Sequence, residues 1–416
     1  MKKIVSLSLV ILLSGIQYSC ENEDQDKPLP EPKQIEVDAP TLQLIGSGNQ
    51  MGFELFKKIH DSQEPSQNTM ISPVSVALAL AMTYNGAEGD TKSAMEEALQ
   101  LTGLSRQQIN ASYRALIEAL LTVDPKVTME IANSIWYRQE FSVEQDFLDV
   151  NQEYYDAEVS ALDFNSSEAP SIINDWVSDK TNGKITKIID QIDPLTMMYL
   201  INAIYFNGKW RYQFDPDKTS DEPFYLADSS EIQVPMMQTE ADLGYFSHDL
   251  FRAVEMPYGR GNYTMVCFLP REEYRVDDVI GAMNEDNWDQ WMNGFQEYPV
   301  QVHLPKFKFE YKKSLKEILI QMGMGVAFDP LESDFSGINP DRDDLHISEV
   351  KHKTFIEVDE KGTEAAAVTS VTMNATSADP AGPVVVKFDR PFVFAIREVT
   401  TGTVVFAGKV VKPSSE

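Results

Sequence analysis

Cysteine is nearly absent from this chain of 416 residues, which contains only Cys20 and Cys267. A framework of disulfides is therefore excluded. A chain of this length with 43% hydrophobic residues needs none, because it can bury a core of ordinary size. Cys267 stands inside the apolar run 263–269, which is typical of a buried strand, so we expect its thiol to be a small core side chain.

Basic residues are scarce as well. The chain has 35 Lys and Arg against 65 Asp and Glu, giving a formal net charge of −30. Binding to nucleic acid or directly to anionic lipid is disfavoured, because both depend on clustered positive charge. We interpret the acidic excess as a solubility device.

No hydrophobic run is long enough to span a bilayer comfortably. The longest N-terminal run, 4–16, follows Lys2 and Lys3 and precedes Ser19-Cys20 and an acidic stretch. This pattern resembles a bacterial lipoprotein signal, which predicts a signal peptide over 1–19 and a lipid anchor on the Cys20 thiol. An ordinary cleaved signal peptide is the alternative. Either way the protein is expected to be exported, anchored to the bacterial envelope or secreted.

Residues 20–40 have little that could be buried. They combine acidic residues with four prolines, Pro28, Pro30, Pro32 and Pro40. This composition predicts a tether. Beyond it we find no second linker and no internal repeat, so we predict one compact domain over 41–416.

Hydrophobic spacing predicts helices mainly in the first half and strands mainly in the second, an α+β architecture with large sheets. Ser72 is predicted to cap a helix that has Pro73 in its first turn. The predicted helices cover 49–60, 73–85, 90–99, 106–121 and 314–322, and one more lies within 172–190 and is ended by Gly183. The predicted strands cover 197–205, 263–269, 300–304, 307–311, 355–358, 384–388, 392–398 and 403–410.

One segment does not suit a compact domain. About 25 residues separate the strand-like runs 355–358 and 384–388, too many for a simple connector. Within them, residues 365–378 contain no charge, no glycine and no proline, which is unusual for a disordered loop. If the segment became a strand, one face would be small or apolar. That face holds Thr363, Ala365, Ala367, Thr369, Val371 and Met373.

Four motifs in this order resemble those of the serpin family, and the similarity extends over residues 48–413. They are NTMISPVS at 68–75, LINAIYFNGKW at 200–210, VDEKGTEAAA at 358–367 and VKFDRPFVFAI at 386–396. The resemblance implies the serpin fold, in which helices pack around large central sheets and a reactive loop is exposed. It also implies suicide-substrate inhibition, in which a protease cleaves the loop and the cleaved loop inserts into the central sheet. The rival reading is a non-inhibitory serpin that binds a ligand or partner.

The resemblance assigns roles within the loop. The hinge comprises Glu360, Gly362, Thr363, Ala365, Ala366 and Ala367, and its small side chains favour inhibition. Counting from the hinge places the reactive bond at Thr376-Ser377, with Met373-Asn374 and Ala375-Thr376 as alternatives. No Lys or Arg lies between Lys361 and Lys387. Trypsin-like proteases therefore lack a primary anchor, and elastase-, subtilisin- or chymotrypsin-like enzymes or some cysteine proteases are preferred.

A second set of residues matches serpin positions around the opening of the sheet. These are Ser72, Ser75, Asn202, His352 and, at the top of the sheet, Trp210. The alternatives for them are simple polar capping and core packing.

A hydrolase is disfavoured because neither Ser72 nor Ser75 lies in a Gly-x-Ser-x-Gly motif. The histidines lack the spacing of zinc ligands. No metal or cofactor is expected. Glycosaminoglycan binding is not expected either, because the fourth helix carries only Arg106 and Arg114. The expected partner is a target protease in covalent complex with a monomer.

Overall fold

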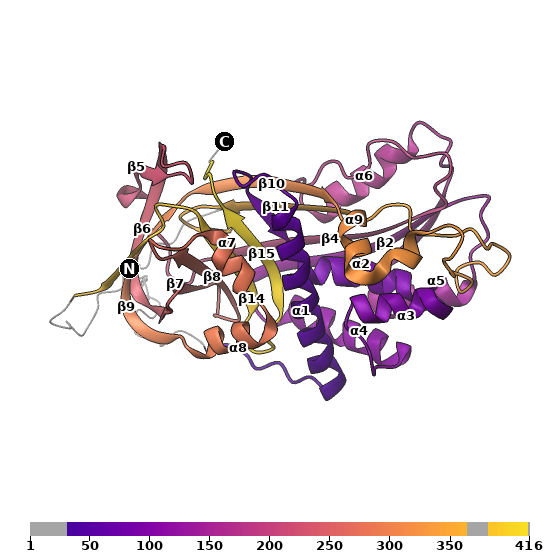
Figure 1. Ribbon diagram of the computed structural model, residues 1–416, viewed down its shortest axis with the longest axis horizontal. Helices are drawn as coiled ribbons and strands as arrows, with labels where there is room; N and C mark the ends of the chain where they lie inside the picture. The colour runs from indigo at the N-terminus through magenta and orange to yellow at the C-terminus, as the bar shows by residue number, and fades with distance from the viewer. Residues whose placement is uncertain (1–30, 364–381, 415–416) are drawn as a thin grey trace, which may run out of the picture. The chain divides into compact units, whose positions relative to one another are not determined.

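The computed structural model describes residues 31–363 and 382–414. It confirms the α+β class, with helices packed around two large sheets (Figure 1). No helix among these residues is both long and apolar enough to cross a membrane. The helices are α1 Ala39–Asp61, α2 Pro73–Tyr84, α3 Gly89–Ala98, α4 Arg106–Thr122, α5 Gln145–Tyr155, α6 Ala169–Lys180, α7 Val276–Ala282, α8 Glu285–Asn293 and α9 Lys316–Leu319.

The strands of the described residues form a six-stranded and a nine-stranded sheet. The smaller sheet has the order β10-β11-β12-β4-β2-β3, with bounds Phe307–Ser314, Lys351–Val358, Gly362–Thr363, Met198–Lys209, Val127–Arg138 and Glu158–Leu162. The larger has the order β1-β15-β14-β8-β7-β6-β9-β13, with β5 also paired to β6. Its bounds are Thr69–Ile71, Val404–Val410, Phe392–Glu398, Tyr263–Pro270, Phe251–Pro257, Glu231–Ser247, Gln296–Pro305, Val384–Lys387 and, for β5, Ser220–Tyr225.

The first helix begins earlier than predicted, at Ala39 and so within the predicted tether. Asp38 caps it, since the Asp38 carboxylate accepts a hydrogen bond from the Thr41 N–H at 3.0 Å. Pro40 stands in the first turn, where a backbone N–H would have no acceptor within the helix, so its absence in proline costs nothing. Upstream, the Lys33 N–H donates to the Asn262 side chain at 2.8 Å. The predicted boundary at residue 41 is therefore too late.

Two further predictions need correction. The α-helix expected over 314–322 is shorter and covers only α9. A π-helical turn over 320–324 follows it and is kinked at Gly323, whose φ is +101°. The helix expected within 172–190 is α6, which begins at Ala169 and ends at Lys180, three residues before the predicted end at Gly183. The Ser72 cap is confirmed, because the Ser72 hydroxyl accepts a hydrogen bond from the Ser75 N–H at 3.2 Å.

The main core lies between the sheets and helices α1 and α2, and Cys267 is fully buried in it as predicted. A second, smaller core joins α6 to the outer face of β2 and β4. There Trp136 of β2 meets Trp176 of α6 edge-on, with ring centroids 6.1 Å apart. Helix α6 and the chain that follows it thus cover one face of the six-stranded sheet (Figure 1).

Candidate strand-insertion site

Strands β4 and β11 are neighbours that do not pair with each other. Among the described residues, only the two-residue strand β12 lies between them. Thr363 of β12 faces Val358 of β11 on one side and Gly208 of β4 on the other. Below this point no ladder joins β4 to β11 within the described chain. We call the space between residues 198–207 and 351–357 the insertion gap.

Gly362 fits this position because it has no side chain. A Cβ atom added there would collide with the carbonyl oxygen of Gly208 on β4. Opposite it, a Cβ on Gly208 would lie 2.9 Å from the Tyr258 ring. Two glycines thus allow the hinge backbone to enter the sheet, which is the close approach that favours glycine.

Thr363 is fixed by a tyrosine from the other sheet. Its hydroxyl and the Tyr258 hydroxyl are 2.6 Å apart, and Thr363 is 4% exposed. The Tyr258 ring stacks on Trp210, with centroids 4.4 Å apart and planes within 13°. Burial raises the pKa of Tyr258 well above its ordinary value, so the phenol stays neutral. A small polar side chain is therefore satisfied at the entrance of the gap.

The turn before β12 is held by its own aspartate and by Trp210. The Asp359 carboxylate accepts from the backbone N–H groups of Lys361 at 2.8 Å and Gly362 at 3.2 Å. The indole of Trp210 donates to the Asp359 carbonyl at 2.9 Å, and the Trp210 N–H donates to the Lys361 carbonyl at 2.9 Å. Trp210 thus lies at the top of the sheet and contacts the hinge itself.

Glu360 anchors the same turn to the nine-stranded sheet. Lys306 pairs with one carboxylate oxygen at 2.9 Å, and the Thr219 hydroxyl donates to the other at 2.9 Å. Burial alone would raise the pKa of Glu360, but the hydrogen bonds from Lys306 and Thr219 outweigh burial and leave that pKa lowered. The carboxylate therefore stays charged at neutral pH.

We expect Glu360→Gln to weaken this anchor by about 1 kcal/mol, because the amide keeps its shape but loses the charge that Lys306 pairs with. Heat-induced conversion to a loop-inserted form should then become about fivefold faster. The half-time of conversion, followed by native gel electrophoresis, measures this. Glu88→Gln, which removes an ion pair with Arg106 far from the hinge, is the control. Equal acceleration in the two variants would contradict the role of Glu360.

Farther down the gap, β11 is fastened to the start of α2 by a buried histidine. The Ser72 N–H donates to Nε2 of His352 at 3.1 Å. The Ser72 hydroxyl in turn accepts from the Ser75 N–H and caps α2. His352 is 4% exposed, and burial lowers its pKa to about 4. An imidazole that accepts at Nε2 must be neutral there, which agrees with the lowered pKa.

Asn202 lies on β4, at the opposite border of the gap. Its amide donates to the Asn133 side chain at 2.7 Å, and Asn133 donates to the Tyr155 carbonyl at 2.7 Å. The Oδ1 atom of Asn202 is buried and has no hydrogen-bond partner among the described residues. The structure thus brings Ser72, Ser75 and His352 together, whereas Asn202 bonds elsewhere.

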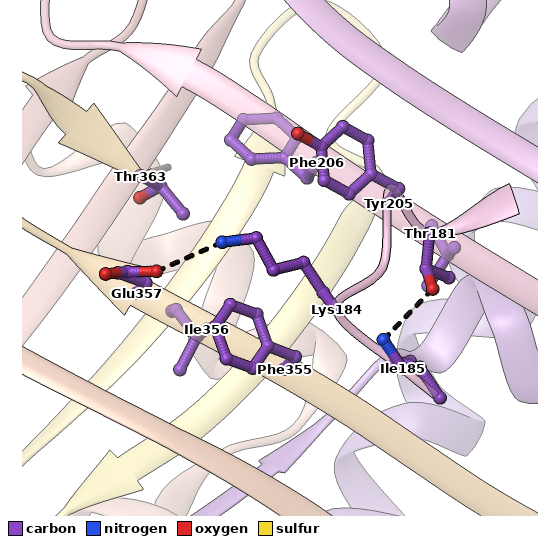
Figure 2. Close-up of a pocket in the computed structure, with 10 residues that line it drawn as sticks. Thr181, Lys184, Ile185, Tyr205, Phe206, Phe355, Ile356, Glu357 and Thr363 are labelled. Carbon is purple, nitrogen blue, oxygen red and sulfur yellow. Dashed lines mark hydrogen bonds and ion pairs between the residues drawn. The ribbon is translucent and has the colours of Figure 1, made fainter. Parts of the chain in front are cut away.

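A pocket opens directly below Thr363 (Figure 2). Its walls come from both borders of the gap and from the chain after α6. They are formed by Thr181, Lys184, Ile185, Ile204, Tyr205, Phe206, Phe355, Ile356, Glu357 and Thr363. The next residues of a strand continuing from β12 would enter at this place.

The remaining predicted residues lie outside the described part of the chain. These are Ala365, Ala366 and Ala367 of the hinge, the reactive-bond candidates Met373, Asn374, Ala375, Thr376 and Ser377, and Cys20. Sequence reasoning had missed Tyr258, Lys306 and Asn133. Tyr258 directly follows β7, and Lys306 lies between β9 and β10, so their only signal in the sequence was a position after or between apolar runs.

The two-residue strand β12 thus lies between β11 and β4, which pair on their other sides with β10 and β2. The family model described as Serpin (serine protease inhibitor) matches residues 47–413. An uncharacterized serpin-like protein of Thermococcus kodakarensis is 33% identical over 405 residues, 96% of this chain and 89% of that protein. Human antithrombin-III is 32% identical over 415 residues, 97% of this chain and 88% of that protein.

Solved structures agree with these relatives. The native state of the thermophilic serpin tengpin has a TM-score of 0.82 and 35% identity, covering 91% of this chain and 96% of that one. Human thyroxine-binding globulin, in complex with thyroxine, has a TM-score of 0.82 and 28% identity, covering 90% of this chain and 100% of that one. The chain belongs to the serpin family, whose members are mostly protease inhibitors rather than catalytic enzymes, although thyroxine-binding globulin is non-inhibitory.

Proposed function

We propose that this serpin is an irreversible suicide-substrate inhibitor of extracellular serine endopeptidases, with cysteine endopeptidases as alternative targets. The position of β12 between β4 and β11, at the entrance of the insertion gap, carries this proposal. The loop already starts along the path that insertion requires. A protease would form an acyl-enzyme at the loop, and insertion of the cleaved loop would drag the protease with it and distort its catalytic site before deacylation.

The register of β12 supports this path. Continued downward, the pairing of Thr363 with Gly208 and Val358 places residue 369 opposite both Asn202 and His352. Thr369 would point inward like Thr363, because the two positions differ by six and alternate residues of a strand share a face. Its hydroxyl would then come close to the Asn202 Oδ1 that now lacks a partner. The same register carries Met373 to Met198, where β4 begins.

The energy of insertion is large enough to disturb a protease. About ten inserted residues would add main-chain hydrogen bonds of about 1 kcal/mol each. Burial of Val371 and Met373 would add about 1.5–3 kcal/mol for each side chain. The sum is on the order of 10 kcal/mol, comparable with the stability of about 5–15 kcal/mol of a folded protease.

The test is incubation with elastase, subtilisin, chymotrypsin, papain and trypsin. We expect an SDS-stable complex with an elastase-, subtilisin- or chymotrypsin-like enzyme and none with trypsin, since no Lys or Arg lies between Lys361 and Lys387. N-terminal sequencing of the released peptide identifies the reactive bond, which we propose to be Thr376-Ser377. Cleavage of the loop without any complex, and without a gain in thermal stability, would reject inhibition.

The proposal places the inhibitor outside the cytoplasm, on a lipid anchor at Cys20 or released from the cell. The support is the short apolar run 4–16 followed by Cys20 and an acidic stretch. Extracellular targets follow from this location.

A further inference from the structure

The chain between α6 and β4 crosses the insertion gap on the outer face of the sheet. One side of it is fixed to α6 and β4. The Asn174 side chain of α6 accepts from the N–H groups of Ile188 and Ile189 at 2.8 and 2.9 Å. Ile185, Ile188 and Ile189 pack in the second core with Ile201 of β4. These contacts hold the crossing chain to α6 and β4.

The crossing chain is also fastened to β10 and β11. Lys353 of β11 donates to the Lys187 carbonyl at 2.8 Å, and Lys312 of β10 pairs with Asp190 at 2.9 Å. Lys184 itself reaches β11. Its Nζ lies 3.2 Å from the Glu357 carboxylate and 5.1 Å from the centroid of the Phe355 ring. Figure 2 shows the Lys184 side chain extended between Tyr205 and Phe206 of β4 and Phe355 and Glu357 of β11. We call Lys184, Glu357 and Phe355 the latch.

The latch lies where the inserting strand must pass. It lines the pocket directly below Thr363, so the residues that follow Thr363 along the strand would meet the Lys184 side chain first. The Lys184 side chain crosses this space to reach the Glu357 carboxylate at 3.2 Å, so a strand that passes between β4 and β11 below Thr363 must displace it. Each insertion event must therefore open the latch.

We propose that Lys184 is a positioning residue whose ion pair with Glu357 and contact with Phe355 set the rate at which the sheet accepts the loop. This inference rests on the proposed inhibitory function. A closed latch slows premature insertion in the intact inhibitor. After cleavage it is the first contact broken, and it influences the competition between insertion and deacylation.

The experiment compares the full-length protein with Lys184→Met, which keeps the alkyl packing but removes the charge. Lys187→Met is the matched control, because the Lys187 side chain pairs with Asp190 of the same segment at 2.9 Å, and Asp190 keeps its second ion pair, with Lys312 of β10 at 2.9 Å. Lys184→Arg is the conservative rescue. A synthetic peptide with the sequence of residues 363–376 is the probe, and its incorporation is followed by the gain in thermal stability.

We expect peptide incorporation to be roughly tenfold faster in Lys184→Met and unchanged in Lys187→Met and Lys184→Arg. In about 1 M salt, where the Debye length is about 3 Å, the unmodified protein should approach the Lys184→Met rate. The number of inhibitor molecules consumed per protease should fall in parallel. A merely structural role would lower the melting temperature and leave the incorporation rates equal, and that result would overturn the latch.

The peptide assay involves no protease, so the two proposals fail separately. Faster incorporation in Lys184→Met together with no covalent complex would reject the inhibitory function and leave the latch supported. Covalent complexes together with equal incorporation rates in Lys184→Met and Lys187→Met would reject the latch alone.

Discussion

Replacing Thr363 with arginine is expected to convert the inhibitor into a substrate. Thr363 is 4% exposed, and its hydroxyl is 2.6 Å from that of Tyr258, whose own ring is fully buried. Before cleavage an arginine would therefore be expelled from the sheet, and insertion would have to bury its guanidinium without a carboxylate, at a cost of about 3 kcal/mol or more. Insertion should therefore slow by a factor of about 100 or more.

The measurement is the fate of the protease. Deacylation should win the competition, so we expect the Thr363→Arg loop to be cleaved at the ordinary rate while active protease is recovered. The cleaved variant should also lack the gain in melting temperature that insertion gives. Thr363→Ser is the control, because it keeps the hydroxyl for Tyr258 and should still form complexes. Complexes of Thr363→Arg at the unmodified stoichiometry would show that insertion does not begin at β12.

The sequence predicted best the features that depend on residues close together in the chain. The Ser72 cap and the bounds of α2 and α4 depend on neighbours within four residues, and they were predicted to within one residue. Residues 31–38 were misjudged, because prolines suggested a tether. The contact of Lys33 with Asn262 is made across 229 positions, which no local pattern reveals.

The same reasoning applies to strand β2. It lies between β4 and the edge strand β3 of the six-stranded sheet, yet it was not predicted, because polar residues interrupt its apolar pattern. Asn133 at its centre is 2% exposed and is satisfied by the Tyr155 carbonyl and by Asn202. A buried amide of this kind looks like a surface residue until its partners are known. Tyr258 was missed for the same reason, since its partner Thr363 is 105 positions away.

His352 should make the native state sensitive to mild acid. Burial lowers its pKa to about 4, whereas an unfolded histidine has a pKa of about 6.5. The folded protein therefore binds the proton more weakly than the unfolded chain. The contribution is fully present above pH 6.5, is lost as the pH falls from about 6.5 to about 4, and levels off below that. The loss amounts to about 3 kcal/mol.

Protonation also removes the acceptor for the Ser72 N–H, which joins β11 to the start of α2 at the border of the insertion gap. We therefore expect the acid-induced loss to favour opening of the sheet. Between pH 7.5 and pH 4.5 the midpoint of thermal unfolding, measured at a fixed scan rate, should fall by about 5 °C. Peptide incorporation should accelerate over the same range.

His352→Asn offers an acceptor that does not titrate, so most of this pH dependence should disappear in that variant. His303→Asn is the matched control, because burial also lowers the pKa of His303 while His303 lies on β9, in the other sheet. If His352→Asn keeps the full drop and His303→Asn loses it, the acid sensitivity belongs to the nine-stranded sheet. Peptide incorporation, which requires β4 and β11 to part, would then show whether opening of the gap still depends on pH.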